Sequence, residues 1–424
     1  MMIIIRIILY LCSVSLFFFI ARPVSSLTID EAIEMAKRNA PFYRATELKI
    51  RATEALYKAT LSPYLPVLDV STLQSRHYTS SIDYNMRNYE VKLSYTIFDG
   101  GIRRNERDLA LLNLDIDREE FRKSLLELEY QVRVAYYTVI ATKEILDLRT
   151  IQLKDAEKDH EVAEGRYRFG VARFSDVLQA SVRLQQARFN LAQAEGDMRK
   201  ALSELNSLIG RDLDSPFDLQ GSLNTDFEIP ERERLFDAGM KGPEVIQAEK
   251  NLSIAERNRS KALSPFFPVL SLNASYSKTE GGIFRFTFPE EKRIDLSATW
   301  NIFELGKFFR LKSFEREIDI SSERLKEVKR QTLLDIYRAI QDLSTAMSKV
   351  KVAEEQLRQA QHNYEQAFGE YKVGKADILS LVQAESQLAT AREQLINSRL
   401  SVILSKSLLE RIAALEIKEV MDKR

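Results

Sequence analysis

Ser62-Pro-Tyr-Leu-Pro-Val-Leu68 and Ser264-Pro-Phe-Phe-Pro-Val-Leu270 are two copies of one motif, 202 residues apart. A second motif follows each copy, since Tyr95-Thr-Ile-Phe-Asp-Gly-Gly101 recurs as Trp300-Asn-Ile-Phe-Glu-Leu-Gly306. Self-similarity at a nearly constant offset, with the landmarks in the same order, indicates two structural repeats in one chain. Each repeat is therefore expected to contain the same sequence of helices and strands.

A very long helix is predicted after the second motif in each repeat. Residues 102–164 and 307–368 contain neither Gly nor Pro and are rich in Leu, Glu, Lys, Arg and Ala. At 1.5 Å per residue each stretch could form a helix of roughly 95 Å. Glycines are expected to end these helices and reverse the chain. They have the same spacing in both repeats, at Gly165 and Gly170 and at Gly369 and Gly374.

The segments that follow these glycines carry the heptad pattern of returning helices. Large apolar residues alternate with mostly small ones in steps of three and four over residues 177–208 and 381–412. Small residues along the seam let neighbouring helices approach closely, which suits coiled-coil packing. Long helix pairs are thus predicted at 102–209 and 307–415, and the fold class is mainly α with a small β part.

The β part is predicted from a change of hydrophobic period. Apolar and polar side chains alternate over residues 89–97 and 294–302, which indicates strands with one apolar and one polar face. One hairpin is therefore expected in each repeat, at about 67–98 and about 269–303.

Four strands cannot close on themselves within one chain. In a membrane, where open sheet edges are not tolerated, several copies of the chain would have to close the sheet together. A soluble sandwich is the alternative, although the sequence predicts no second sheet to cover the apolar faces. In the membrane interpretation, the candidate lipid-facing residues are Tyr89, Val91, Leu93, Tyr95, Leu296 and Trp300.

Composition and charge limit the class of protein. The 424 residues include 62 Lys plus Arg and 62 Asp plus Glu, and 45% are hydrophobic, which argues against nucleic-acid binding and against disorder. Residues 1–26 place a short apolar run after Arg6 and end in small residues, which is typical of a secretory signal peptide. An uncleaved membrane anchor is the alternative. Cys12, the single cysteine, lies in this segment, so the mature chain would contain no disulfide.

No pattern in the sequence predicts an enzyme. His77, His160 and His362 are far apart, and the sequence from His160 to Glu164 lacks the second histidine of a zinc protease motif. The sequence contains neither a glycine-rich nucleotide loop nor a nucleophile elbow. We therefore expect no catalytic residue, no metal and no cofactor, and active transport would depend on the energy of partner proteins.

The duplicated motifs, in their order, resemble the TolC family of outer-membrane efflux proteins, over essentially all of residues 27–415. The resemblance implies a homotrimer, in which a twelve-stranded β-barrel in the outer membrane joins a twelve-helix α-barrel that forms a periplasmic tunnel. The expected parts are the signal peptide 1–26, a first repeat 27–210, an equatorial connector 211–242, a second repeat 243–415 and a C-terminal tail 416–424.

The implied function is that of a passive exit duct. It would serve a tripartite efflux or type I secretion system, together with a periplasmic adaptor and an inner-membrane pump that is proton-driven or of the ABC type. The alternative from another class is an exported periplasmic coiled-coil protein with a structural or tethering role. The sequence does not specify the transported substrate.

The resemblance also places two sites at the turns between the long helices. The adaptor-docking tip would consist of Phe169, Gly170, Val171, Val373, Gly374 and Lys375. The candidates for the aperture or gate are Arg173, Asp176, Asp377, Ser380 and Gln383. Some relatives carry acidic rings at the aperture, but the aligned positions here are Ser380 and Gln383, which does not favour an acidic cation filter. Arg173 could instead pair with Asp176 or Asp377 to hold the tip shut.

Overall fold

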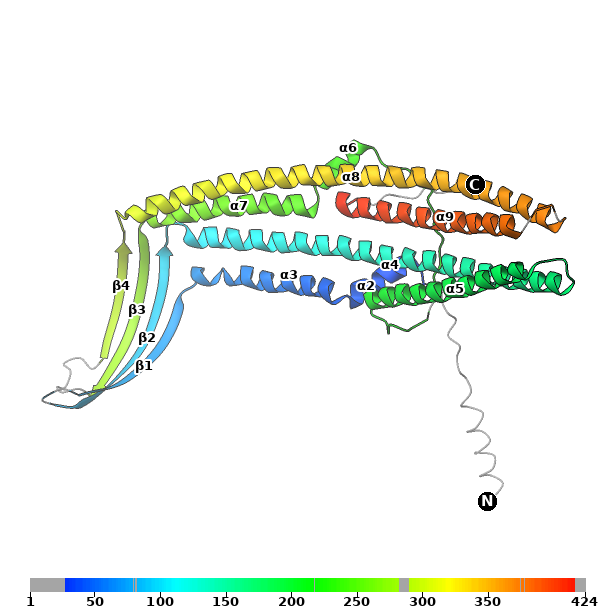
Figure 1. Cartoon of the computed structure of the whole chain (residues 1–424). Coiled ribbons are helices and arrows are strands. Elements are labelled where there is room, and N and C mark those ends of the chain that lie inside the picture. The colour runs from blue at the N-terminus through cyan, green and yellow to red at the C-terminus, as the bar shows by residue number, and fades with distance from the viewer. Residues whose placement is uncertain are drawn as a thin grey trace, which may run out of the picture.

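The computed structural model is an elongated molecule, with a curved sheet at one end and long helices running away from it (Figure 1). It describes residues 27–78, 80, 82–216, 218–281, 290–373, 375–376 and 378–415. The predicted signal peptide and C-terminal tail lie outside the described residues.

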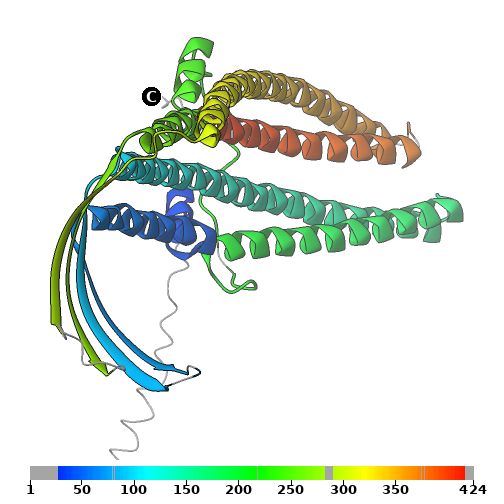
Figure 2. The ribbon, with the colours of Figure 1, turned by 90° about the vertical axis from the view of Figure 1, so that its left-hand side faces the viewer.

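The sheet has four antiparallel strands in the order β1-β2-β3-β4. The strands are β1 (Val67–His77), β2 (Tyr84–Phe98), β3 (Val269–Gly281) and β4 (Glu290–Thr299). One hairpin comes from each repeat, and β2 pairs with β3 to join the two hairpins. Figure 2 shows that this single sheet curves away from the helices.

The register aligns the apolar faces of all four strands. Tyr95 lies opposite Leu272, and Leu272 lies opposite Leu296 on the next strand. The adjacent row is also apolar, with Leu93 next to Ala274. Residues directly opposite one another in an antiparallel pair point to the same face. The alternation predicted from the sequence therefore produces one continuous apolar surface.

Trp300 differs from its prediction as a strand residue. Strand β4 ends at Thr299, which pairs with Val269, so Trp300 lies one residue beyond the ladder. Its indole N–H donates a hydrogen bond to the carbonyl of Phe266 at 3.0 Å, and the side chain is 57% exposed. This hydrogen bond holds Trp300 against the Ser264–Leu270 motif, where the strand ends.

Four long helices form two pairs, in each of which one helix runs from the sheet to the opposite end of the molecule and the other returns from there only to about the middle (Figure 1). The outgoing helices are α4 (Ile102–Arg168) and α8 (Leu305–Lys372), and the returning helices are α5 (Phe174–Ile209) and α9 (Ile378–Ala413). Gly165 does not end α4 but lies within it, because only Gly170 takes the left-handed backbone conformation.

Shorter elements complete each repeat. The first contains α2 (Ile29–Asn39), α3 (Pro41–Ala59) and η1 (Ser62–Tyr64), and the second contains α7 (Pro243–Leu263) and η2 (Ser264–Phe266). The segment between the repeats contains α6 (Arg232–Met240), which packs on α8. The fold class predicted from the sequence, mainly helical with a small sheet and two equivalent halves, is confirmed.

Each repeat has its own hydrophobic core near the middle of the molecule. The first core is formed mainly by α2, α4 and α5, and the second by α6, α8 and α9. Buried Tyr136 ties the first core to the connector, because its hydroxyl lies 2.7 Å from the carbonyl of Leu27 and 2.5 Å from that of Gln220. Burial raises the pKa of Tyr136 to about 12, so this phenol keeps its proton and remains a donor.

A basic residue at the start of each long outgoing helix fixes the sheet to the helices. Arg103 donates to the carbonyl of Pro63 at 2.9 Å, and buried Lys307 donates to the equivalent carbonyl of Pro265 at 2.6 Å. Gly100 lies between the two repeats, and a Cβ there would come within 2.4 Å of the Ser264 carbonyl oxygen. The Asp-Gly-Gly motif thus permits a close approach that a larger residue would prevent.

Candidate functional site

The turn between α4 and α5 is closed by a glycine cap. Gly170 has φ +73°, and the N–H of Val171 donates to the carbonyl of Arg166 at 3.0 Å. This is the hydrogen-bond pattern of a Schellman-type cap. A Cβ at Gly170 would meet no described atom within 4 Å, so the glycine is needed for its backbone conformation and not for space.

The turn between α8 and α9 repeats this arrangement. The N–H of Lys375 donates to the carbonyl of Glu370 at 2.9 Å, as Val171 does to Arg166 in the first turn. The two turns also touch, because the Arg166 guanidinium lies 5.0 Å from the ring centroid of Tyr371. Gly374 and Asp377, which were predicted as site residues here, lie outside the described residues.

Large apolar side chains at these turns face solvent. Phe169 is 86% exposed, Val171 is 65% exposed and Val373 is 67% exposed. The exposed apolar surface continues along one flank of α5 through Phe174, Leu178, Val182 and Phe189. A contiguous exposed patch of this kind marks an interaction surface, because isolated apolar residues are normal on a surface but clusters are not.

Two of the gate candidates, Arg173 and Asp176, are in contact, but through the backbone of Arg173 and not through a side-chain ion pair. The carboxylate of Asp176 accepts the backbone N–H of Arg173 at 3.2 Å and so caps the start of α5. Among the described residues, no side-chain ion pair joins Arg173 to Asp176. Ser380 and Gln383 are exposed in the first two turns of α9.

A polar cluster farther along the helices was not predicted. Arg183 on α5 forms an ion pair with Asp159 on α4 at 2.9 Å, and it also pairs with Glu385 on α9. Tyr364 on α8 is close enough for the charge of Asp159 to raise the pKa of its phenol, although burial is the larger cause. All four long helices therefore meet at one node, which we name the Arg183 node (Asp159, Arg183, Tyr364 and Glu385).

The Arg183 node joins the first repeat to the second. Burial raises the pKa of Asp159, against the opposing effect of the Arg183 charge. A second ion pair between the same halves, from Arg149 on α4 to Glu393 on α9, lies nearer the sheet. The sequence signal for the node was faint: Arg183 and Glu385 each adjoin a seam residue, Leu184 and Ala384, but at positions of the two repeats that are not equivalent.

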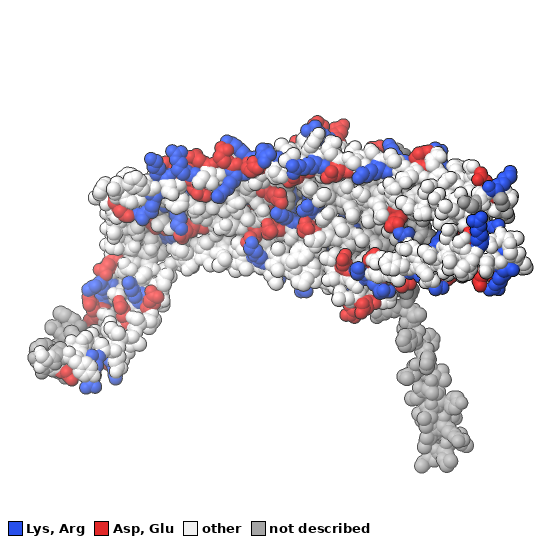
Figure 3. Space-filling model, viewed as in Figure 1, with Lys and Arg blue, Asp and Glu red and all other residues white. Residues whose placement is uncertain are grey.

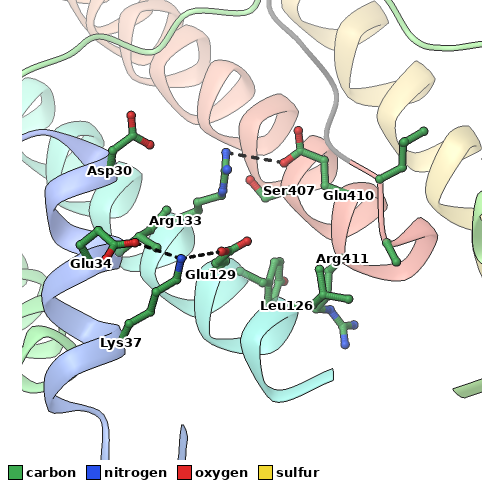
Figure 4. Close-up of a pocket in the computed structure, with 13 residues that line it drawn as sticks. Asp30, Glu34, Lys37, Leu126, Glu129, Arg133, Ser407, Glu410 and Arg411 are labelled. Atoms are coloured by element: carbon green, nitrogen blue, oxygen red, sulfur yellow. Dashed lines mark hydrogen bonds and ion pairs between the residues drawn. The ribbon is translucent and has the colours of Figure 1, made fainter. Parts of the chain in front are cut away.

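A cavity of about 410 Å³ lies at the middle of the molecule, between α2, α4 and α9 (Figure 4). Lys37 bridges Glu34 at 3.1 Å and Glu129 at 3.3 Å across it. Burial lowers the pKa of Lys37, but its hydrogen bonds to both carboxylates outweigh burial and raise it. Lys37 thus links α2 to α4 through Glu129, and we assign no ligand to this cavity.

In the described part of the chain, no group of three His, Cys, Asp or Glu side chains is arranged to hold a metal ion. None of the helices described has both the length and the apolar character that a membrane crossing requires.

Comparison with known proteins identifies the family to which this chain belongs. The profile described as outer membrane efflux protein matches residues 32–211 and 238–414, which is well over half of the chain and omits most of the connector. The chain belongs to the outer membrane efflux protein family. The two matched segments correspond to the two repeats.

Relatives of this efflux family cover most of the chain. Protein CyaE of Bordetella pertussis is 25% identical over 381 residues, which span 88% of this chain and 80% of CyaE. Outer membrane protein TolC of Escherichia coli is 20% identical over 365 residues, which span 81% of this chain and 73% of TolC. The crystal structure of outer membrane protein VceC from Vibrio cholerae has a TM-score of 0.79 at 16% identity, covering 92% of this chain and 97% of VceC.

Membership confirms the main predictions from the sequence. The protein is an outer-membrane exit channel of the kind used in efflux and type I secretion systems, and it resides in the outer membrane. Proteins of this family are channels and not enzymes. The channel therefore takes precedence over the alternative of an exported structural coiled-coil protein, and the exit step depends on pump partners.

Proposed function

We propose that three copies of the chain form one passive exit duct, with the sheets closing a barrel in the outer membrane and the helices forming a tunnel in the periplasm. The observation that carries the proposal is the four-stranded sheet. Among the described residues, β1 and β4 each have one edge without a strand partner. Such edges are not tolerated in hydrocarbon, so β1 of one copy would pair with β4 of the next.

The helical part also supports assembly. Helix α3 has no buried residue, and Leu48 and Leu56 on it are 60% and 66% exposed. A groove of about 570 Å³ between α7 and α8 has Ile254 and Val328 in a lining that also contains polar and charged residues. A helix face with exposed leucines and a partly apolar groove on one protomer are candidate contact surfaces for neighbouring copies.

At the far end, the turns would dock a periplasmic adaptor. Phe169, Val171 and Val373 supply exposed apolar contact surface, and the glycine-capped backbone of the first turn presents it on a rigid loop. Gly170, Gly374 and Lys375 belong to the same proposed docking site. The adaptor would connect the duct to an inner-membrane pump, either proton-driven or of the ABC type.

The aperture would lie just inside this tip. Arg173, Asp176, Ser380 and Gln383 border it, and the sequence adds Asp377. The Arg183 node would hold the second helix pair against the first, since it links α4 and α5 to α9. Partly exposed ion pairs contribute only about 0–1 kcal/mol each, so the node in three copies would bias the closed state without locking it.

Cysteine cross-linking tests the proposed strand pairing. The sequence has no cysteine after Cys12, so Val70→Cys on β1 and Ile294→Cys on β4 introduce unique thiols. With a short bifunctional maleimide, the double variant in outer-membrane fractions should give covalent dimers and trimers, whereas each single variant should not give trimers. A double variant that links only within one chain would contradict the trimer.

A further inference from the structure

The apolar face of the sheet ends in a row of charged residues near the hairpin ends, far from the helices. Tyr276 lies opposite Val91 and Lys292, and in the next row Lys278 lies opposite Tyr89 and Glu290. Because opposed residues share a face, the charged residues point the same way as the apolar rows below them. This charged border, which we name the outer row, extends over four successive rows and consists of Arg76, Arg87, Lys278, Glu280, Glu290 and Lys292.

The other face of the sheet has no such order. Its charged residues begin in the middle of the strands, where Asp69 lies opposite Lys92, and extend toward the hairpin ends at Glu90 and Glu291, which both lie opposite Ser277. Segregation into an apolar band and a charged border is therefore a property of one face. The space-filling view shows acidic and basic side chains gathered on part of the sheet, with uncharged surface beside them (Figure 3).

Basic groups exceed acidic groups in the outer row. Glu280 forms an ion pair with Lys278 at 2.9 Å, and Glu290 is a hydrogen-bond partner of Tyr276. Within the described residues, no carboxylate lies within 4.0 Å of Arg76, Arg87 or Lys292. The hairpin loop at 282–289, which is not described, contains no acidic residue in its sequence. Arg76 and Lys292 thus form no ion pair with a described carboxylate, and Arg87 has only the more distant charge of Glu280, which lies opposite it.

The position of the row fits the edge of a hydrocarbon layer. About 27 Å of strand separates Leu270, at the base of the apolar face, from Lys278. A strand tilt near 40° reduces this to a height of about 20 Å, close to the apolar band of about 25 Å in membrane barrels. When the apolar rows lie in hydrocarbon, the basic groups reach the level of the head groups.

We infer that the outer row is a binding surface for phosphate-bearing head groups of lipids in the outer leaflet of the outer membrane. The inference rests on the proposed orientation of the sheet. Guanidinium and ammonium groups match phosphate in charge and hydrogen-bond geometry, and an anionic head group supplies the close counter-charge that no described carboxylate gives these three cations. Three copies would repeat the row around the outside of the barrel.

Lipid binding to the full-length protein in neutral detergent, measured by native mass spectrometry, tests the row. The probe is bisphosphorylated lipid A, and the variant is Arg87→Gln combined with Lys292→Gln. The matched control, Lys92→Gln combined with Arg293→Gln, removes the same charge from the opposite face. Each basic group at an anionic surface contributes a factor of roughly five, so the row variant should bind roughly 25-fold more weakly and the control unchanged.

Two comparisons complete the test. Dephosphorylated lipid A should bind the unmodified protein about as weakly as bisphosphorylated lipid A binds the row variant, because the phosphates carry the attraction. Equal affinity of the row and control variants for bisphosphorylated lipid A would overturn the inference. Inorganic phosphate that displaces the lipid at equal concentration would also overturn it, because the site would then recognise a free anion. The sheet orientation is tested separately, by arginine substitutions at Leu296 and Ser297.

Discussion

Arginine in place of Leu296 should prevent assembly in the membrane, whereas arginine at the neighbouring Ser297 should be tolerated. Leu296 lies opposite Leu272 in the middle of the apolar face and is 73% exposed in the single chain, which leaves it available to lipid. Ser297 points to the polar face, where its hydroxyl donates to the carbonyl of Ser271 at 3.3 Å. The two side chains point to opposite faces of the sheet, but the two residues lie at nearly the same depth in the membrane.

The expected difference is large. An arginine on the lipid face near the bilayer midplane costs about 2–4 kcal/mol, so three copies cost roughly 6–12 kcal/mol per trimer. That range is comparable with the whole free energy of unfolding of a typical domain, about 5–15 kcal/mol. Loss of the long hydrogen bond at Ser297 costs only about 0.5–1.5 kcal/mol.

The assay is the yield of trimer in outer-membrane fractions, resolved by electrophoresis without heating. Leu296→Ala is the control, because it shortens the side chain but keeps the face apolar. We expect little trimer for Leu296→Arg and near-normal trimer for Leu296→Ala and Ser297→Arg. Equal yields for the two arginine variants would refute the orientation of the sheet.

Four further predictions concern the helical part of the molecule. Arg183→Gln should raise single-channel conductance in planar bilayers, since it removes the pairs with Asp159 and Glu385; unchanged conductance would exclude the node from gating. Because burial raises the pKa of Asp159, the pair with Arg183 should weaken as the pH falls through that raised pKa and the carboxylate takes up a proton. Conductance should then rise on acidification, and Asp159→Asn should abolish most of this pH dependence. Phe169→Asp should leave the trimer intact, because the Phe169 side chain is already exposed, but it should reduce adaptor cross-linking and export. The control is Lys200→Asp, at an exposed position on α5. Tyr136→Phe should lower the free energy of unfolding by about 1–3 kcal/mol, since it removes a buried donor from two carbonyls. An unchanged melting temperature would contradict a stabilising role for the Tyr136 hydroxyl.

The helices and strands could be predicted because their signals are local. Gly101 and the Gly-free stretch after it indicated a helix from residue 102, where α4 begins. Period-two alternation indicated the strands, and the register then aligned their apolar residues across all four. Trp300 was misplaced because the end of β4 depends on pairing with Val269, which a single strand's pattern does not contain.

The Arg183 node could not be predicted in the same way. It requires α4, α5, α8 and α9 to meet at one height, which depends on how the two repeats slide against one another. Charged residues beside a coiled-coil seam are common, and most of them contact only solvent or a neighbour on the same helix. The duplication does not relate Arg183 to Glu385, and only the packed structure brings them together.

Electron microscopy of the purified full-length protein in detergent tests the central claim most directly. Three copies with paired strand edges should give particles of threefold symmetry, with a central hole in end view and a long tapered body in side view. Solid rods without a hole, or folded single chains at working concentration, would contradict the account of this protein as a trimeric exit duct.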